Sequence, residues 1–399
     1  MDVVRQIQSF NAGRDPERLQ LKYRAMRSSA FTFLRGTCHL FYDRLPRGGV
    51  FKSAPAVWVC GDLHLENFGS YKGDNRLVYF DINDFDESAL APASWDLVRF
   101  MTSLLIGADS LSIDNATAQA LCRIFLDAYA SALMLGKPYW VERLTATGLV
   151  RELLDALSER QRSGFLDSRT VLKGKKRQLR VDGKKALPAT DKQRAVITNF
   201  MQEFAQKQAD PGFYKVLDVA RRIAGTGSLG VDRYAILIHG KGNPDGNYLL
   251  DLKQALPSSL VPHLSVAQPT WKTEAHRVVA LQQRMQAVSM AFLQPVLVDK
   301  NACTLRALQP SEDRIALDRS DRRSIDLERM VSSMGGIVAW AQLRSAGREG
   351  SAIADELIDF GRRKKWQDKL RSAAQDCAEQ VRRDAAVYNA AWDDGVFNG

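Results

Sequence analysis

The chain has 399 residues, of which 45% are hydrophobic and 26% charged; this is ordinary globular composition, with enough length for at least two cores. No run of about eighteen uncharged apolar residues occurs, and the start MDVVRQIQSFNAGRD lacks the basic and apolar segments of a signal peptide. We therefore expect a cytoplasmic protein without a membrane partner. The five cysteines are scattered and form no Cys-x-x-Cys pair, which argues against disulfides and zinc. The net charge of +10 favours anionic ligands but selects no function.

The first part of the chain contains two apolar runs that end on acids. Residues 16 to 45 carry apolar side chains at helical spacing, and the AVWVC run after them predicts a short strand ending at Cys60. The LVYFDIND run predicts a second such strand. Three helices are expected next, two between residues 93 and 135 and one at about 139 to 160; the second begins at Ser112 or Asp114 and ends near Gly136.

The pattern of the second part of the chain predicts an antiparallel sheet followed by helices. Residues 166 to 190 are rich in Lys and Arg around an Asp-Gly turn, which predicts an exposed basic hairpin. Three strands with a glycine loop and a tight turn follow, up to LLDLKQA. A helix is expected at about 270 to 292, two strands at QPVLVD and CTLRALQ, and helices over roughly 324 to 396.

The GTGSLG segment matches the pattern G-x-G-x-x-G, which dinucleotide-binding and protein-kinase-like folds share. A dinucleotide site needs a helix directly after the last glycine, whereas VDRYAILIHG alternates as a strand does. The segment therefore predicts a loop between two strands whose bare backbone can close over phosphates. The expected nucleotide-binding residues are Gly225, Thr226, Gly227, Ser228, Leu229 and Gly230.

Lys253 lies on the next predicted strand, between apolar neighbours. This placement suits the phosphate-binding lysine of a kinase, although an isolated strand lysine is more often simply solvated. The usual partner of that lysine is a glutamate on the following helix. Glu274 is the only acidic residue between positions 254 and 298, so it is the expected partner.

The acidic strand ends supply groups for phosphoryl transfer. Asp62 is placed to accept a hydroxyl proton, and Asn67 offers a neutral oxygen to Mg²⁺. His64 stands between them and is counted with the catalytic group, although a buried structural histidine fits the same pattern. The second strand end contributes Asp81, Asp84 and Asp86, of which only one or two are expected as Mg²⁺ ligands.

These residues resemble those of aminoglycoside-phosphotransferase-like kinases. GDLHLENFG is similar to their catalytic loop, and the acid-ended strand followed by APASWDLVR is similar to their magnesium motif and the segment after it. The resemblance implies that Asp62 is the catalytic base and that Asp96 supports the catalytic loop from below. It also implies that Asn67 and one strand-end aspartate bind magnesium. Asp84 is the preferred ligand, and Asp81 is the alternative.

The whole chain more closely resembles the bacterial family called "domain of unknown function 2252", from about residue 20 to 350. The similar segments are KYRAMRSSAFTFLRG, GDLHLENFG, FDINDFDE, WDLVR, GTGSLG and LKQA. Three positions depart from the expected pattern: Cys60 stands in place of a histidine, Gln254 in place of an acid and Gln342 in place of a histidine. These departures leave catalytic activity open.

The order of the segments is inverted relative to ordinary kinases, because the glycine loop and Lys253 follow the catalytic loop. We therefore expect an α+β, two-lobed, kinase-like fold that is circularly permuted, with the helical lobe first and the antiparallel nucleotide-binding sheet second. Leu308 would end the strand that leads to the hinge beside adenine. The expected parts are a catalytic helical lobe (1–165), a basic hairpin and connecting helix (166–210), a nucleotide-binding sheet (211–310) and C-terminal helices (311–399).

The leading hypothesis is a phosphotransferase that uses ATP and Mg²⁺ to phosphorylate a hydroxyl of a small molecule. A non-catalytic nucleotide-binding regulator is the first alternative, because Cys60 and Gln254 depart from the pattern, and a nucleotidyl transferase on the same scaffold is the second. The net charge and the basic stretch at 173 to 185 also allow nucleic-acid binding. A solvated basic face explains them as well, so no nucleic-acid partner is expected.

Overall fold

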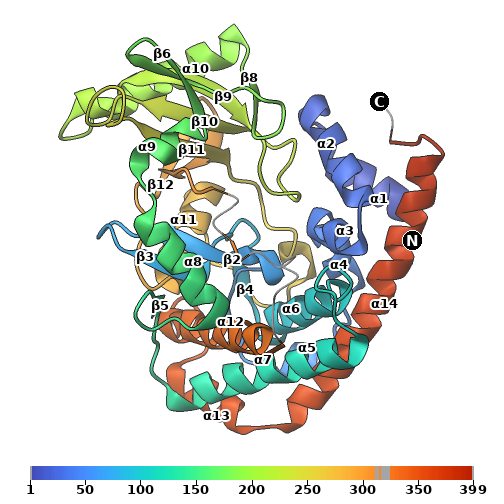
Figure 1. The fold of residues 1–399 in the computed structure, drawn as a ribbon. Coiled ribbons are helices and arrows are strands. Elements are labelled where there is room, and N and C mark those ends of the chain that lie inside the picture. The colour runs from blue at the N-terminus through green and yellow to red at the C-terminus, as the bar shows by residue number, and fades with distance from the viewer. Residues whose placement is uncertain (1, 311–313, 316–323, 398–399) are drawn as a thin grey trace.

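The computed structural model describes residues 2–310, 314–315 and 324–397 (Figure 1). It is a mixed α and β fold whose sheets are antiparallel, so the predicted α+β class is confirmed. The helices are α1 (Val3–Phe10), α2 (Pro16–Arg27), α3 (Ala30–Gly36), α4 (Cys38–Arg44), α5 (Val50–Ser53), α6 (Ser94–Ile106), α7 (Asn115–Leu135), α8 (Gly148–Glu159), α9 (Arg162–Asp167), α10 (Asp191–Ala205), α11 (Glu274–Met285), α12 (Ser324–Ser345), α13 (Ala354–Arg362) and α14 (Lys365–Asp393).

The strands fall into one six-stranded sheet and three smaller ones. Short 3₁₀ turns lie at Leu65–Asn67, Pro211–Tyr214 and Val261–His263. The strands are β1 (Ala56–Val59), β2 (Phe68–Lys72), β3 (Val78–Ile82), β4 (Ala89–Pro92), β5 (Val141–Glu142), β6 (Thr170–Lys173), β7 (Lys176–Leu179), β8 (Ala186–Pro188), β9 (Val216–Arg222), β10 (Arg233–Ile238), β11 (Tyr248–Gln254), β12 (Gln294–Val298) and β13 (Asn301–Ala307).

The six-stranded sheet has the order β12–β13–β11–β10–β9–β8 and is antiparallel throughout. One face packs on α10 through a core that includes Ile197, Ile236 and Leu252. The glycine loop joins β9 to β10, and Arg233 on β10 lies opposite Lys253 on β11. The sheet therefore holds the loop and the lysine on neighbouring strands.

The segment 56–92, which contains the short strands β1 to β4, lies between the large sheet and the helices below it (Figure 1). β1 pairs with β4, and β2 pairs with β3, which also pairs with β5. α6 follows this segment directly, and every one of its residues is buried. The turns after β1 and β3 therefore rest on a rigid base while they face the large sheet.

Long helices form the main core below the strands. α7 packs against α12, α13 and α6, and α14 runs along α6 at the edge of the molecule (Figure 1). α7 is the one helix among the described residues that is long and apolar enough to cross a membrane, and half of its most apolar window is buried within the fold. Its packing is that of a core helix, so this feature is weak evidence for a membrane span.

Local capping explains where the predicted helices begin and end. The apolar run over 16 to 45 is divided, because the Ser29 side chain accepts a hydrogen bond from the Thr32 amide and starts a new helix, α3. The Asp114 carboxylate caps α7, and Gly136 ends it with a φ of 63°. The third predicted helix begins only at Gly148, because Val141 and Glu142 pair with β3.

The basic hairpin is confirmed, but its turn lies elsewhere than expected. β6 and β7 pair antiparallel, with Lys173 opposite Lys176, so the chain reverses at Gly174, which has a φ of 60°. The Asp182 carboxylate instead accepts hydrogen bonds from the amides of Lys184 and Lys185. This local turn leads the chain into β8 at the edge of the large sheet.

Candidate functional site

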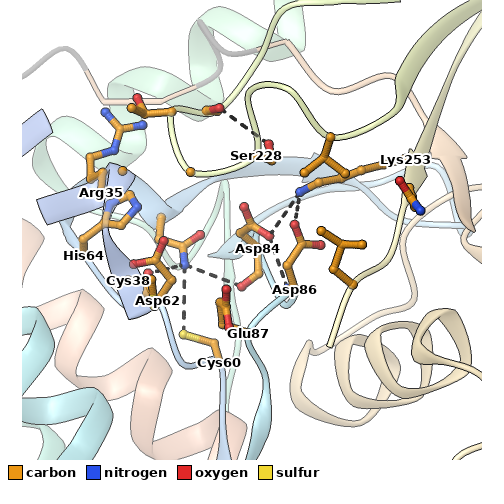
Figure 2. Close-up of a pocket in the computed structure, with 18 of the residues that line it drawn as sticks. Arg35, Cys38, Cys60, Asp62, His64, Asp84, Asp86, Glu87, Ser228 and Lys253 are labelled. Carbon is orange, nitrogen blue, oxygen red and sulfur yellow. Dashed lines mark hydrogen bonds and ion pairs between the residues drawn. The ribbon is translucent and has the colours of Figure 1, made fainter. Parts of the chain in front are cut away.

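A cavity of about 250 Å³ lies between the large sheet and the segment 56–92. Figure 2 shows side chains from both parts of the chain facing this space, with Lys253 on one side and Asp62, His64 and Arg35 on the other. Most of the residues predicted for the site line it together: Asp62, His64, Asn67, Asp84, Gly225, Thr226, Gly227, Ser228 and Lys253. The structure thus brings segments more than 150 residues apart in the chain to one cavity.

The turn after β1 is fixed by Asp96 at the start of α6. The Asp96 carboxylate accepts hydrogen bonds from the amides of Cys60 and Gly61, both at 2.9 Å. Burial raises the pKa of Asp96 to about 6, although these amides lower it. Gly61 has a φ of 84°, and a Cβ there would meet the Glu87 carbonyl oxygen at 2.3 Å. The supporting role that the resemblance implies for Asp96 agrees with this geometry.

Asp62 follows Gly61 and is held by Arg99. The Arg99 guanidinium donates to Asp62 Oδ1 through Nε at 2.8 Å and through a second nitrogen. It also donates to the Leu34 carbonyl oxygen at 3.1 Å, so its position is fixed. Burial raises the pKa of Asp62, and Arg99 opposes that rise. One carboxylate oxygen is thereby oriented, and the other is left for the cavity.

His64 lines the cavity beside Asp62 as a neutral ring. Burial lowers its pKa well below the ordinary value, and neighbouring arginines lower it further. Its Nδ1 atom is buried and has no hydrogen-bond partner among the described residues, and the ring meets Phe31 edge-on at 6.2 Å between centroids. His64 therefore combines the two interpretations of the sequence, because it is a buried histidine that also faces the site.

Asn67 links the two acidic turns. Its amide nitrogen donates to the carbonyl oxygens of Asp62 at 3.0 Å and of Asp84 at 3.5 Å. Its Oδ1 atom accepts no hydrogen bond within the described part of the chain. That oxygen is therefore free to serve as a ligand, as the predicted role requires.

Asp84, and not Asp81, faces the cavity. Asp84 Oδ1 lies 3.8 Å from the Lys253 ammonium; burial raises the pKa of Asp84, but Lys253, Arg306 and Arg233 lower it below the ordinary value. The Asp81 carboxylate instead accepts from the amides of Ile82 and Ala287 and pairs with Arg344 at 3.4 Å. Asp81 thus joins parts of the fold behind the site, and its alternative role as a metal ligand lacks geometric support.

The donor set of this cavity suits Mg²⁺ better than a transition metal. Over residues 2–310, 314–315 and 324–397, no three His, Cys, Asp or Glu side chains are close enough to hold a metal by themselves. Mg²⁺ normally takes only one or two carboxylates and completes its shell with phosphate oxygens and water. Asp84 and the free oxygen of Asn67 fit that requirement.

Four predicted nucleotide contacts lie outside the cavity: Leu229 and Gly230 at the end of the glycine loop, Glu274 and Leu308. The Glu274 carboxylate pairs with Arg277 at 2.6 Å, three residues on in the same helix, and Lys253 pairs with Asp86 and Asp84. The expected pair of Glu274 and Lys253 is therefore wrong. Leu308 does not line this cavity; its amide donates to the Leu249 carbonyl oxygen at 2.9 Å, which extends the pairing of β13 with β11.

The glycine loop is held by α2 and by the turn before it. Arg14 donates to the carbonyl oxygens of Gly227 at 2.9 Å and Leu229 at 3.3 Å, and Lys22 donates to that of Gly227 at 3.1 Å. The amides of Thr226, Gly227 and Ser228 make no hydrogen bond within the described part of the chain. With the carbonyl oxygens of Gly227 and Leu229 bound in this way, the loop is left with unused amide donors for an anion.

Several cavity and support residues were not predicted from the sequence. Arg99 follows Asp96 by three positions in a helix, which places both on one face, so the WDLVR segment carried a local signal. Arg14 and Lys22 carried no such signal, because only the folded chain brings them to the glycine loop. Glu87 also lines the cavity and accepts from the Ser259 amide at 2.6 Å. Asp86, which the sequence offered as a possible Mg²⁺ ligand, lines the cavity as well and pairs with Lys253.

A comparison with protein family models identifies the family of this chain. The family model described as "Uncharacterized protein conserved in bacteria (DUF2252)" matches residues 14–391. The match covers nearly the whole chain, and the protein belongs to this family. No curated protein and no solved structure gave a match.

Proposed function

We propose that the protein is a phosphotransferase that uses ATP and Mg²⁺ and phosphorylates a hydroxyl group of a small molecule. One observation carries this proposal: Asp62, Asp84, Lys253 and the glycine loop line the same cavity. Phosphoryl transfer needs these parts together, namely donors around the phosphates, a metal ligand and a carboxylate beside the acceptor hydroxyl.

Each group has a role that its surroundings support. Lys253 and the free amides of Thr226, Gly227 and Ser228 would hold the phosphates of the donor. Asp84 and Asn67 would hold Mg²⁺, which neutralises charge on the transferring phosphate when bound. Asp62, oriented by Arg99, would take the proton of the acceptor hydroxyl.

The transfer balances as a direct displacement. The acceptor oxygen forms a bond to the γ-phosphorus, and the bond from that phosphorus to the bridging oxygen breaks. The hydroxyl proton passes to Asp62, and ADP carries away the released electron pair. No covalent intermediate with the protein is needed, because positioning and charge stabilisation supply most of the catalysis in this reaction class.

The arrangement of strands supports a kinase-like fold in permuted order. The glycine loop joins the adjacent strands β9 and β10, Lys253 lies on the next strand β11, and a helix, α11, follows. Protein kinases place these parts in the same succession. We infer that the sheet and the helical base correspond to the two lobes of a kinase, joined in the opposite order.

A nucleotide-binding regulator without transfer is the second candidate. Two observations favour it: Arg99 binds Asp62 Oδ1 with two nitrogens, which weakens the carboxylate as a base, and Lys253 pairs with Asp86 and with the proposed metal ligand Asp84. Binding of MgATP without turnover in the wild-type protein would establish this alternative.

The test compares nucleotide binding and turnover in matched variants. We expect Lys253→Met to weaken MgATP binding by about tenfold or more, since a charge-assisted contact to phosphate is lost. Asp62→Asn should bind MgATP within about threefold of wild type but lose about a hundredfold in turnover. Glu274→Gln is the control and should match wild type. If Lys253→Met and Asp62→Asn also behave as wild type, the assigned roles are wrong.

A further inference from the structure

A second cavity, of about 690 Å³, shares no lining residue with the first. Its walls come from three parts of the chain: residues between 70 and 78, residues between 157 and 166 at the link from α8 to α9, and the large sheet with its connecting loops. Its volume lies within the range of roughly 300–1,000 Å³ that encloses drug-sized ligands. The second cavity is therefore large enough for a ligand of its own.

The apolar wall of the second cavity is aromatic. Phe213, Tyr248 and Phe292 all line it. The ring centroids of Phe213 and Tyr248 lie 4.9 Å apart, and those of Phe213 and Phe292 lie 5.9 Å apart. The three side chains are only half-buried, so part of each ring is left for a ligand. Aromatic rings add stacked or edge contacts to simple burial, and this wall therefore suits a planar, apolar body.

The polar part of the lining is strongly basic. Among the described residues that line the second cavity, one acidic side chain, Asp74, stands against five basic ones: Lys72, Arg76, Arg160, Arg162 and Lys241. The first cavity, in contrast, is lined by four acidic and four basic side chains. Clustered charges of one sign beside an apolar wall raise the local concentration of the opposite ion. An anion without a metal ion is therefore drawn to the second cavity more than to the first.

Arg162 joins the aromatic wall to the basic lining. The carbon atom of its guanidinium group lies 4.1 Å from the centroid of the Tyr248 ring. Arg162 is exposed, and it makes no hydrogen bond or ion pair with any residue in the described part of the chain. A guanidinium group that stacks on a ring keeps its N–H donors at its edge. Arg162 can thus extend the flat wall and bind an anionic group at the same time.

From these observations we propose that the second cavity binds a small anion with a planar aromatic body. The ring of the ligand packs against Phe213, Tyr248 and Phe292, and its anionic group lies at Arg162. This inference does not rest on the proposed function, because the two cavities have no lining residue in common.

The experiment measures binding of three probes to the full chain by calorimetry, without Mg²⁺ or nucleotide. Naphthalenesulfonate carries both the ring and a permanent negative charge, naphthol is the neutral counterpart, and sulfate is the anion alone. We expect one naphthalenesulfonate per chain, with a dissociation constant on the order of 1 mM or lower for a ligand of this size. Naphthol and sulfate should bind at least about tenfold more weakly, because each lacks half of the contacts. Absence of naphthalenesulfonate binding at about 10 mM, or equal binding of naphthol, would overturn the inference.

Variants locate the bound probe. Arg162→Gln should weaken naphthalenesulfonate binding by about fivefold or more, because a charged hydrogen bond is lost. Arg143→Gln is the matched control and should match wild type, since Arg143 pairs with Asp155 on the surface and does not line the cavity. Lys253→Met should also bind the probe as wild type does, because Lys253 lines only the first cavity.

Two outcomes with these variants would contradict the inference. Wild-type affinity in Arg162→Gln would show that Arg162 does not hold the anionic group. Loss of binding in Lys253→Met would place the probe in the first cavity. MgATP binding, measured in parallel on the same proteins, reports on the proposed function alone, so the two proposals can fail separately.

Discussion

Asp62 is subject to two opposing influences on its acidity. Burial raises its pKa above the ordinary 3.8, and Arg99 lowers it. A base must be ionised to accept a proton, so turnover should fall as the pH drops through this raised pKa. In Arg99→Met the opposing cation is gone, and the acid limb of the pH–rate profile should move to higher pH.

The measurement is kcat/KM against pH for wild type, Arg99→Met and Arg99→Lys. Arg99→Lys keeps the charge and should restore most of the original position of the acid limb. Circular dichroism checks that each variant is folded, because Arg99 is fully buried. An acid limb that stays in place in Arg99→Met would show that Asp62 is not the titrating base.

Asp81 and Asp84 form a matched pair with opposite expected effects. Asp84→Asn should raise the Mg²⁺ concentration needed for half-maximal nucleotide binding by about tenfold or more, because a carboxylate ligand is lost. Asp81→Asn should leave that dependence unchanged but destabilise the fold by about 3 kcal/mol, since Arg344 would lose its buried partner. Magnesium titrations and urea unfolding separate the two effects. The reverse pattern would assign the metal to Asp81.

Single residues also show the limits of sequence reasoning. Asp62, Asn67 and Lys253 were found because each follows or lies on a strand that local alternation predicts. Glu274 was chosen only by elimination, and the neighbouring Arg277, one helical turn away, binds it instead. Which of two nearby carboxylates faces a cavity depends on the pairing of strands, so Asp81 and Asp84 stayed unresolved until the fold was known.

At the level of elements, the contact between α1–α2 and the glycine loop is the feature that sequence patterns missed. Arg14 lies in the turn between the two helices and Lys22 in α2, and both donate to Gly227. We expect Arg14→Ala to speed hydrogen exchange over residues 225–230 and to weaken MgATP binding by about tenfold, because a charged hydrogen bond no longer holds the loop.

The control for this prediction is Arg27→Ala. Arg27 also belongs to α2, but it pairs with Asp393 on the surface at 2.9 Å and does not contact the loop. Arg27→Ala should leave both the hydrogen exchange of residues 225–230 and the affinity for MgATP at the wild-type level. Equal exchange in Arg14→Ala and wild type would mean that the contact does not position the loop.

Element types were predicted more reliably than their ends. The strands of the large sheet and the helix caps at Asp114 and Gly136 follow from local chemistry. The hairpin turn at Gly174 and the helix start at Gly148 depend on which strands the flanking residues join. Pairing partners lie far away in the chain, so single-sequence patterns do not determine them.

At the scale of the whole molecule, the glycine loop approaches α3 and the turn after β1 at Gly227. A Cβ at this position would lie 3.0 Å from the Arg35 carbonyl oxygen and 3.9 Å from Asp62 Oδ2. Gly227→Ala should therefore hold the loop away from Asp62 and lower kcat by about tenfold while binding changes little, because small displacements reduce transfer steeply.

Gly164→Ala is the matched control, because no atom lies within 4 Å of its added Cβ. Turnover by each variant under saturating MgATP gives the comparison. A normal kcat in Gly227→Ala would indicate that the approach of the loop to Asp62 has no part in transfer. A similar loss in Gly164→Ala would point to a general effect on folding.

The most direct measurement is a crystal structure with Mg²⁺ and a non-hydrolysable ATP analogue. We expect the β- and γ-phosphates to contact Lys253 and the amides of Thr226, Gly227 and Ser228, with the terminal phosphate facing Asp62 and the metal on Asp84. Phosphates that bind in another cavity, or that touch Lys253 while Asp62 faces away from them, would contradict the shared site on which the proposed function depends.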